Sequence, residues 1–279
     1  MSPSSSHQPA ITAEAAAALL EPLTDLVIRA GAAILAVDRS GMRIEGKTDG
    51  SPLTEADQAA DRIIAEGLAA LAPRIPTLSE ERTHVSEHPY HCAFFLIDPL
   101  DGTREFVDGR DEFTVNVALI SGGTPILGIV GAPALGLVWR GVVGRGAERL
   151  RVASDGLSRT AEPIRTRPHP GRSAPWTVAV SRSHGDKRTE QFIAERPGAI
   201  RQVLGSAVKF CRVAEGAVDI YPRLSPTSEW DVAAGHAVVI AAGGQVADSK
   251  GAPLNFGAGR EDFLVPEFIA WGDPAAAGQ

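Results

Sequence analysis

The sequence lacks several features that would assign a protein to a broad class. Among its 279 residues are only two cysteines, Cys92 and Cys211, which lie far apart and have no CxxC partner. That spacing excludes a disulfide framework and a structural zinc site, and it favours a reducing, cytoplasmic location. No apolar run approaches the roughly 18 residues that a membrane-spanning helix needs. The formal net charge of -7 argues against a general nucleic-acid binder.

The two ends of the chain also lack a regular pattern. Residues 1–9 are rich in Ser and Pro and have neither the basic region nor the apolar core of a signal peptide. The tail after Trp271 is rich in Gly, Ala and Pro, and we expect both ends to be loose. Between them, no internal repeat occurs. Apolar residues make up 44% of the chain, which is enough for a sizeable core in one large domain or two lobes.

Two segments near the N-terminus show the periodicity of amphipathic helices. In residues 12–38 apolar side chains recur at helical spacing. Pro22 predicts a break or a late start there, because proline has no backbone N–H to donate. In residues 54–71 an apolar stripe follows Thr54, a candidate N-cap, and Pro73 follows the predicted end of the helix.

The middle of the chain has the pattern of a β-sheet. Residues 93–97 form a short apolar run, which predicts a buried strand that ends at Asp98. Apolar and polar positions alternate in residues 112–120, and Gly122-Gly123 then turns the chain into two further apolar segments. This succession predicts an antiparallel meander.

A change in composition suggests two lobes. Residues 155–175 are rich in Pro, Arg, Thr and Ser, which is typical of a boundary. We therefore predict an N-terminal lobe over residues 1–155 and a C-terminal lobe over residues 156–279. Strands and helices alternate in the second lobe, and its last predicted helix covers residues 230–242.

Acidic residues stand at three boundaries between predicted elements. They are Glu80 with Glu81, Asp98 with Asp101, and Asp231. An isolated carboxylate is usually a solvated surface group or a helix cap. Asp98 and Asp101 differ because they flank the end of a buried strand. Clustered carboxylates repel one another unless a cation lies between them, so the pattern indicates a metal site.

The DPLDGT segment, residues 98–103, has groups for both a metal and a phosphate. Mg²⁺ takes about six oxygen ligands. The carboxylates of Asp98 and Asp101 and the carbonyl of Leu100 can converge on one such ion. The segment leads into a predicted short helix over residues 104–107, whose first N–H groups favour an anion. Metal and N–H donors in one turn suit phosphoryl transfer, so the segment predicts a Mg²⁺-dependent phosphatase.

Three motifs, taken in this order and spacing, resemble the inositol monophosphatase superfamily of lithium-sensitive, Mg²⁺-dependent phosphatases. They are LSEE at 78–81, DPLDGT at 98–103 and WDVAAGHAVVIAAGG at 230–244. KTDGSPLTEAD at 47–57 looks like a further element of that family. The resemblance covers residues 15–272. It implies an α+β fold, a layered αβαβα sandwich, with the active site between the lobes.

Three other segments resemble one branch of the superfamily, the CysQ-type 3'(2'),5'-bisphosphate nucleotidases. They are SRSH at 181–184, GSAVKFC at 205–211 and YPR at 221–223. That branch converts adenosine 3',5'-bisphosphate into AMP and phosphate. The resemblance therefore implies in-line attack of an activated water on the 3'-phosphate.

Carried over position by position, the resemblance implies the metal ligands and the catalytic residues. Two or three Mg²⁺ ions would be held by Glu80, Asp98, Asp101, Asp231 and the Leu100 carbonyl. Asp57 and Thr103 would form a hydrogen-bonded pair that orients and activates the attacking water, and Glu80 would also serve in catalysis. Composition alone equally allows Thr54 and Asp57 to be no more than a helix cap.

The resemblance also implies the substrate contacts. Backbone groups of Gly102 and Thr103 would hold the scissile phosphate. The rest of the nucleotide would be contacted by His184, Ser206, Lys209, Arg223 and Asp231.

Three positions depart from the pattern of the branch: Arg104 stands where Lys is usual, Gly50 replaces a common Asn, and Glu229 is an unexpected acid. They bear on fine specificity, since Arg and Lys differ in geometry. Two alternatives stay open: an inositol or sugar phosphate monoesterase, and a nucleotide-sensing protein without turnover. The expected partner is a small phosphorylated molecule and not nucleic acid. We expect a monomer or homodimer in the cytoplasm, either free or peripherally associated at the inner membrane face.

Overall fold

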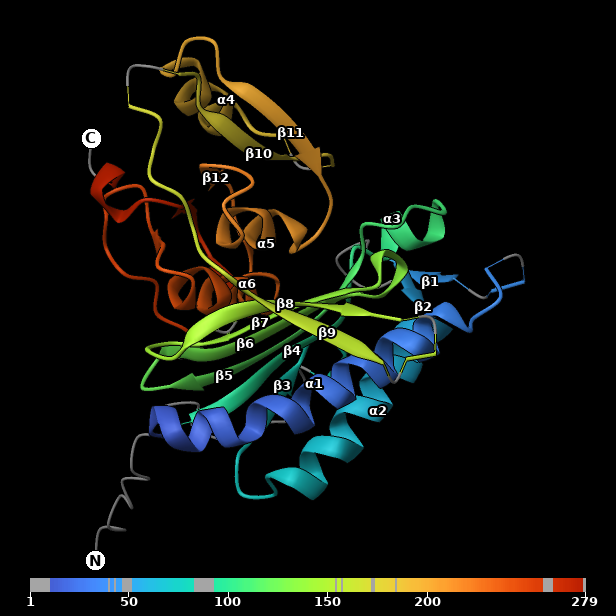
Figure 1. Ribbon diagram of the computed structural model, residues 1–279. Helices are drawn as coiled ribbons and strands as arrows, with labels where there is room; N and C mark the ends of the chain where they lie inside the picture. The colour runs from blue at the N-terminus through green and yellow to red at the C-terminus, as the bar shows by residue number, and fades with distance from the viewer. Residues whose placement is uncertain are drawn as a thin grey trace, which may run out of the picture.

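The computed structural model describes residues 11–39, 41–42, 44–46, 52–82, 93–153, 155–156, 158–171, 174–183, 185–257 and 263–277. Helices and sheets alternate in layers (Figure 1). The helices are α1 (Ala13–Leu35), α2 (Glu55–Leu71), α3 (Thr103–Val107), α4 (Lys187–Ala194), α5 (Val208–Ala214) and α6 (Glu229–Ala241). Short 3-10 turns are η1 (Glu80–Arg82), η2 (Pro133–Leu135) and η3 (Pro274–Ala276).

The larger sheet has seven strands in the order β3-β4-β5-β6-β7-β8-β9. Only β3 pairs in parallel with its neighbour, while the other pairs are antiparallel. The strands are β3 (Thr77–Ser79), β4 (Ala93–Asp101), β5 (Thr114–Ser121), β6 (Thr124–Ala132), β7 (Leu137–Val142), β8 (Gly146–Val152) and β9 (Arg159–Ile164). The predicted meander is therefore present, and it continues through β8 and β9. Although β9 extends this sheet beyond residue 155, the division into two lobes stays a prediction.

The smaller sheet has five strands in the order β11-β10-β12-β16-β14. They are β10 (Thr177–Ser181), β11 (Ile200–Leu204), β12 (Ile220–Arg223), β14 (Gln245–Ala247) and β16 (Phe268–Trp271). Two small pairs complete the fold: β1 (Ile44–Gly46) with β2 (Pro52–Thr54), and β13 (Thr227–Ser228) with β15 (Leu264–Val265).

Strand β4 explains why the layers stack as they do. Its side chains alternate between two apolar cores, with Phe94 and Leu96 in one and Phe95 and Ile97 in the other. The second core lies under α1 and α2, and the first lies under α5 and α6. Because both faces of the sheet are covered, the first part of β4 has a continuous apolar sequence and not an alternating one. A third core joins α4 to the outer face of the smaller sheet, which completes the αβαβα order.

Helix α1 corrects one expectation. Pro22 neither breaks the helix nor delays its start, since α1 runs without interruption from Ala13 to Leu35. Thr12 caps it and accepts a hydrogen bond from the Ala15 N–H. The buried side chains beyond the proline pack on the large sheet and on α2, and this burial outweighs the cost of one missing backbone bond.

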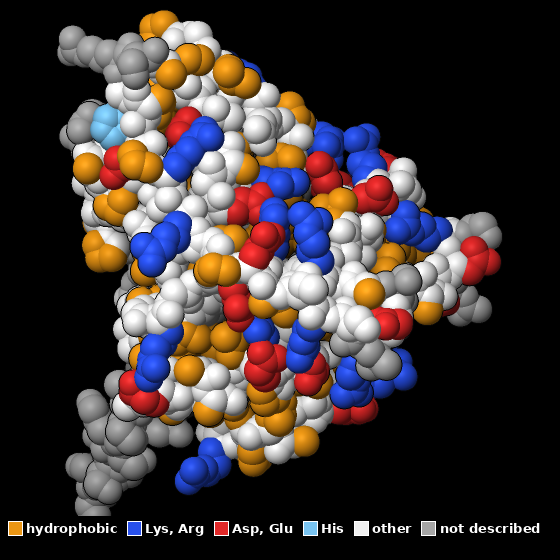
Figure 2. Space-filling model, in the orientation of Figure 1, with side chains coloured by type: hydrophobic (Ala, Val, Ile, Leu, Met, Phe, Trp, Pro, Cys, Tyr) orange, Lys and Arg blue, Asp and Glu red, His pale blue; other side chains and the backbone are white. Residues whose placement is uncertain are grey.

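Charged side chains of both signs are interspersed on the face drawn in Figure 2. Arginines of the large sheet pair with acids of α1: Arg159 with Glu21 and Asp25, and the buried Arg140 with Glu21. Such pairing ties β9 and β7 to α1. In the part of the chain that the structure describes, no helix is both long and apolar enough to cross a membrane.

Arg196, just beyond α4, is surrounded by aromatic rings. Its guanidinium carbon lies 3.9 Å from the ring centroid of Phe192, 5.3 Å from that of Trp176 and 5.6 Å from that of Trp271. Arg196→Ala should lower the free energy of unfolding by about 1–2 kcal/mol, because partly buried cation–π contacts are lost. Urea unfolding measures this. Arg201→Ala, which removes an exposed ion pair with Glu190, should cost less than about 0.5 kcal/mol. Equal losses of unfolding free energy in Arg196→Ala and Arg201→Ala would contradict a stabilising role of these aromatic contacts.

His236 on α6 predicts a pH dependence of stability. Burial lowers its pKa to about 4, and Nδ1 has no hydrogen-bond partner among the described residues. The unfolded chain takes up a proton below about pH 6.5 while the folded protein does not, so stability falls as the pH drops towards 4. From pH 7 to pH 5 the loss should be about 2 kcal/mol. His236→Leu should remove this part of the pH dependence, measured by urea unfolding. If the free energy of unfolding changes with pH in the variant as it does in the wild type, His236 is not its cause.

Candidate active site

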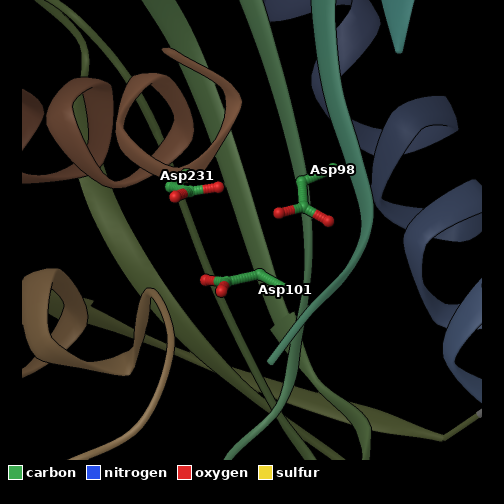
Figure 3. Close-up of side chains that lie close together, drawn as sticks. All are labelled: Asp98, Asp101 and Asp231. Carbon is green, nitrogen blue, oxygen red and sulfur yellow. The ribbon is translucent and has the colours of Figure 1, made fainter. Parts of the chain in front are cut away.

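A bulge in β4 brings two acidic residues to one side of the strand. The pairing with β5 is regular as far as Asp98 opposite Asn116 and resumes with Asp101 opposite Thr114, so β4 has one extra residue. Pro99 lies in this interval and has no N–H for the ladder. The Leu100 N–H donates instead to Asp98 Oδ1 at 3.0 Å. The strand thus continues beyond Asp98, where we expected it to end, and the carboxylates of both aspartates face one space (Figure 3).

Glu80 reaches the same cleft through the parallel pairing of β3. Ser79, the last residue of β3, lies opposite Ile97, so Glu80, which follows it, comes beside Asp98. Glu80 begins the turn η1, and it lines the cleft together with Asp98 and Asp101. Parallel pairing at the end of a buried strand therefore brings together two motifs that are separate in the sequence.

Asp231 comes from another layer. It lies in the first turn of α6, where the helix dipole favours a negative charge, and it accepts a hydrogen bond from Thr227 Oγ1. Oxygens of Asp98, Asp101 and Asp231 all lie within 4.8 Å of one another. Figure 3 shows the three carboxylates turned towards a common space between β4 and α6.

The electrostatics of this cluster fit a bound cation. Burial, and next the charge of Asp231, raise the pKa of Asp101 to about 7, although Thr114 and Asn116 donate hydrogen bonds to it. A carboxyl that is hard to ionise beside other carboxylates is relieved when a cation binds between them. The atoms that the three aspartates offer to a metal ion are all hard oxygen ligands, which suit Mg²⁺.

Asp57 serves as a helix cap and as a partner of the DPLDGT segment, residues 98–103, which we call the metal-binding turn after its proposed role. Its Oδ2 accepts hydrogen bonds from the Thr54 N–H at 2.7 Å and from Thr54 Oγ1 at 2.6 Å, which forms a capping box on α2. Its Oδ1 accepts from Thr103 Oγ1 at 3.1 Å, and that hydroxyl also lies 3.1 Å from the Leu100 carbonyl oxygen. Asp57 is completely buried. The two roles expected for Asp57, helix cap and partner of Thr103, are therefore compatible, since each carboxylate oxygen has its own partner.

Gly102 is required by space as well as by conformation. It precedes α3 with φ of +89°, a left-handed value that favours glycine. A Cβ there would lie 2.2 Å from Ser206 Oγ. The metal-binding turn is consequently in direct contact with the loop that leads into α5.

The same cleft is also lined by cations. They are Lys209, Arg223 and Arg104, which lie in its lining together with Ser206, and the cleft has a volume of about 290 Å³. Burial lowers the pKa of Lys209 to about 8, and the neighbouring charge of Asp101 acts against that shift. Lys209 Nζ donates to the Ser206 carbonyl at 2.6 Å. Carboxylates and cations thus line one cleft. Its volume lies near the low end of the range found for ligand sites in proteins.

One predicted site residue, His184, lies outside the described part of the chain. The same holds for the first part of the KTDGSPLTEAD element with Gly50, and for Cys92. The other cysteine, Cys211, is free and completely buried, and burial raises the pKa of its thiol. The unexpected Glu229 is also buried and accepts a hydrogen bond from the Gly257 N–H at 2.8 Å. It therefore supports the start of α6.

Residues that the sequence did not single out also surround the metal-binding turn. The buried Glu105 accepts a hydrogen bond from Ser183 Oγ at 2.9 Å. Glu112 accepts one from the Gly205 N–H at 2.9 Å. Both acids join segments that are distant in sequence, and no local pattern marks such pairs.

Comparisons with known proteins agree with this arrangement. The model of the inositol monophosphatase family matches residues 16–272. The 3'(2'),5'-bisphosphate nucleotidase CysQ of Shigella flexneri is 40% identical over 259 residues, which cover 90% of this chain and 98% of the relative. A crystal structure of CysQ from Bacteroides thetaiotaomicron has a TM-score of 0.74 and 32% identity, over 90% of this chain and 96% of the other.

An inositol monophosphatase from Anabaena shares the fold, with a TM-score of 0.71 at 23% identity over 92% of this chain and 91% of the other. The predicted α+β sandwich is confirmed by these neighbours and by the observed order of layers. The match over nearly the whole chain, together with the acidic cluster between β4 and α6, assigns the protein: it belongs to the inositol monophosphatase family.

Proposed function

We propose that the protein is a Mg²⁺-dependent 3'(2'),5'-bisphosphate nucleotidase that converts adenosine 3',5'-bisphosphate into AMP and phosphate. One observation carries the proposal: a single cleft is lined both by a carboxylate cluster and by the cations Lys209 and Arg223. A substrate with two phosphates matches both kinds of group. The relative from Shigella flexneri, named as such a nucleotidase, supports the same conclusion.

The residues that fit Mg²⁺ are Asp98, Asp101, Asp231, Glu80 and the Leu100 carbonyl, all of which line the cleft. When bound, two or three such ions would neutralise phosphate charge and lower the pKa of an attacking water. The protein supplies a preformed arrangement, because the bulge in β4 and the first turn of α6 fix the aspartates before any ligand binds.

Asp57 and Thr103 would orient the attacking water. With its single hydrogen directed to Asp57 Oδ1, and not to the Leu100 carbonyl, the Thr103 hydroxyl keeps a lone pair that can accept a hydrogen bond from water. The Thr54 N–H and hydroxyl hold the other oxygen of Asp57, so the carboxylate cannot turn away. The first N–H groups of α3, after Gly102, would hold the scissile phosphate.

Lys209 and Arg223 would bind the phosphate that is not cleaved. With a pKa of about 8, Lys209 is mostly charged at neutral pH and loses its proton as the pH rises above 8. Ser206, Asp231 and His184 complete the proposed substrate contacts. The chain's location in the cytoplasm and its oligomeric state remain predictions.

A panel of phosphate-release assays tests the proposal. With Mg²⁺, the protein should hydrolyse adenosine 3',5'-bisphosphate much faster than inositol 1-phosphate or a sugar phosphate. Removal of Mg²⁺ with a chelator should abolish release, as should Asp98→Asn, which takes a charge from the metal site. Faster release from inositol 1-phosphate would favour the monoesterase. Tight nucleotide binding without release would favour a sensing protein.

Thr103 provides a sharper test of the water-orienting pair. Thr103→Ala should lower kcat by about a hundredfold or more, because the hydroxyl that accepts from water is lost. Thr103→Ser keeps that hydroxyl and should retain most of the activity. The affinity for Mg²⁺, measured by calorimetry, should stay similar in both variants. An alanine variant with nearly full kcat would rule out this role.

A further inference from the structure

The turn between β11 and α5 has an unfavourable backbone conformation. Ser206 has φ of +45°, in the left-handed region, although it is not a glycine. Such a conformation persists only where the surrounding contacts impose it, and it often occurs at functional sites. The contacts of this turn therefore show what holds it.

Most of these contacts come from the metal-binding turn and from Glu112, just before β5. Ser206 Oγ lies 2.9 Å from the Asp101 carbonyl oxygen and 2.9 Å from the Glu112 carbonyl oxygen. The Gly205 N–H donates to Glu112 Oε2 at 2.9 Å. The same carboxylate is paired with Arg182, which follows β10. Glu112 thus contacts the turn through both its main chain and its side chain.

The contact leaves no room for a water molecule. A Cβ on Gly205 would lie 2.6 Å from the Glu112 carbonyl oxygen. On the other side of the turn, a Cβ on Gly102 would meet Ser206 Oγ at 2.2 Å. The two segments are thus packed directly against each other, and a shift of Glu112 must move the turn.

The turn also determines where Lys209 lies. Lys209 Nζ donates to the Ser206 carbonyl at 2.6 Å, and the lysine lies in the first turn of α5, which begins two residues after Ser206. If the turn moves, the cation moves relative to the carboxylates of the cleft. Glu112 itself does not line the cleft.

We propose that Glu112 is a positioning residue: it holds the Gly205–Ser206 turn against the metal-binding turn and so fixes the distance between the metal site and the Lys209 cation. The inference rests on the proposed function, since that distance would select a substrate with two phosphates. A shift of the turn should weaken binding of the second phosphate more than it affects the chemistry at the first.

Kinetics with two substrates test this role. Glu112→Ala should raise the KM for adenosine 3',5'-bisphosphate by about tenfold, with kcat lowered less than about threefold. For p-nitrophenyl phosphate, which has one phosphate, both constants should change by less than about threefold. Glu112→Gln should have a smaller effect, because its amide oxygen can still accept from the Gly205 N–H. Gly205→Ala should reproduce the rise in KM without any change at Glu112.

Glu215→Gln is the matched control. Glu215 is a half-buried acid whose side chain is 6% exposed; it accepts a hydrogen bond from Trp139 Nε1, pairs with Arg149 and Arg212, and does not line the cleft. This variant should lower the Tm and leave the ratio of the two KM values unchanged. If Glu112→Ala leaves that ratio unchanged as well, the positioning role is refuted.

Hydrogen exchange of the substrate-free protein separates this inference from the proposed function. Amides of residues 204–209 should exchange faster in Glu112→Ala than in the wild type, and unchanged protection there would also overturn the role. If the wild type fails to hydrolyse adenosine 3',5'-bisphosphate, the proposed function fails, and the exchange result still decides whether Glu112 holds the turn.

Discussion

The carboxylates of Asp98, Asp101 and Asp231 repel one another, and apolar packing between two layers holds them together against that repulsion. At separations of 4.8 Å or less, each ionised pair costs about 3.5 kcal/mol or more at an effective dielectric constant of about 20. Two of the aspartates belong to β4 and the third to α6, and the core between these elements includes Phe94, Leu96 and Val232. Burial, and next the charge of Asp231, raise the pKa of Asp101, so the repulsion adds to the cost of ionising this carboxyl in the folded protein. The core therefore stabilises the fold and at the same time maintains a site that would otherwise separate.

The same residues repeatedly serve the backbone and the chemistry. Asp57 completes the cap of α2 with one oxygen and contacts Thr103 with the other. The Leu100 N–H, which has left the ladder at the bulge, fixes the rotamer of Asp98. Such double use orients side chains at little entropic cost, because the groups that hold them are already fixed by secondary structure. The cost is a strained backbone at Ser206 and unfavourable electrostatics at Asp101.

The sequence predicted the layered fold, and it singled out Asp98 and Asp101, which lie in the acidic cluster of the structure, because both depend on local patterns. The apolar run before Asp98, the stripe after Thr54 and the family motifs are each contained in a short segment. Contacts between distant segments could not be predicted unless a family motif marked them, as one did for Asp57 and Thr103. Pro22 suggested a break in α1 that burial of the helix overrides, and the extension of β4 beyond Asp98 depends on pairing with β5. Glu112 and Glu105 gave no signal, since their partners lie about eighty to ninety residues away in sequence.

The last strand of the large sheet has a consequence for the protein in a crowded solution. A strand at the edge of a sheet presents unpaired backbone groups, to which another chain can add by the same hydrogen bonds. Strand β9 is such an edge, and most of its residues are exposed. It carries Arg159 and Glu162, both held in ion pairs, and Pro163, which offers no N–H to a newcomer. At the opposite edge β3 is only three residues long. These features disfavour further growth of the sheet at both edges and so help to protect a long antiparallel meander from aggregation.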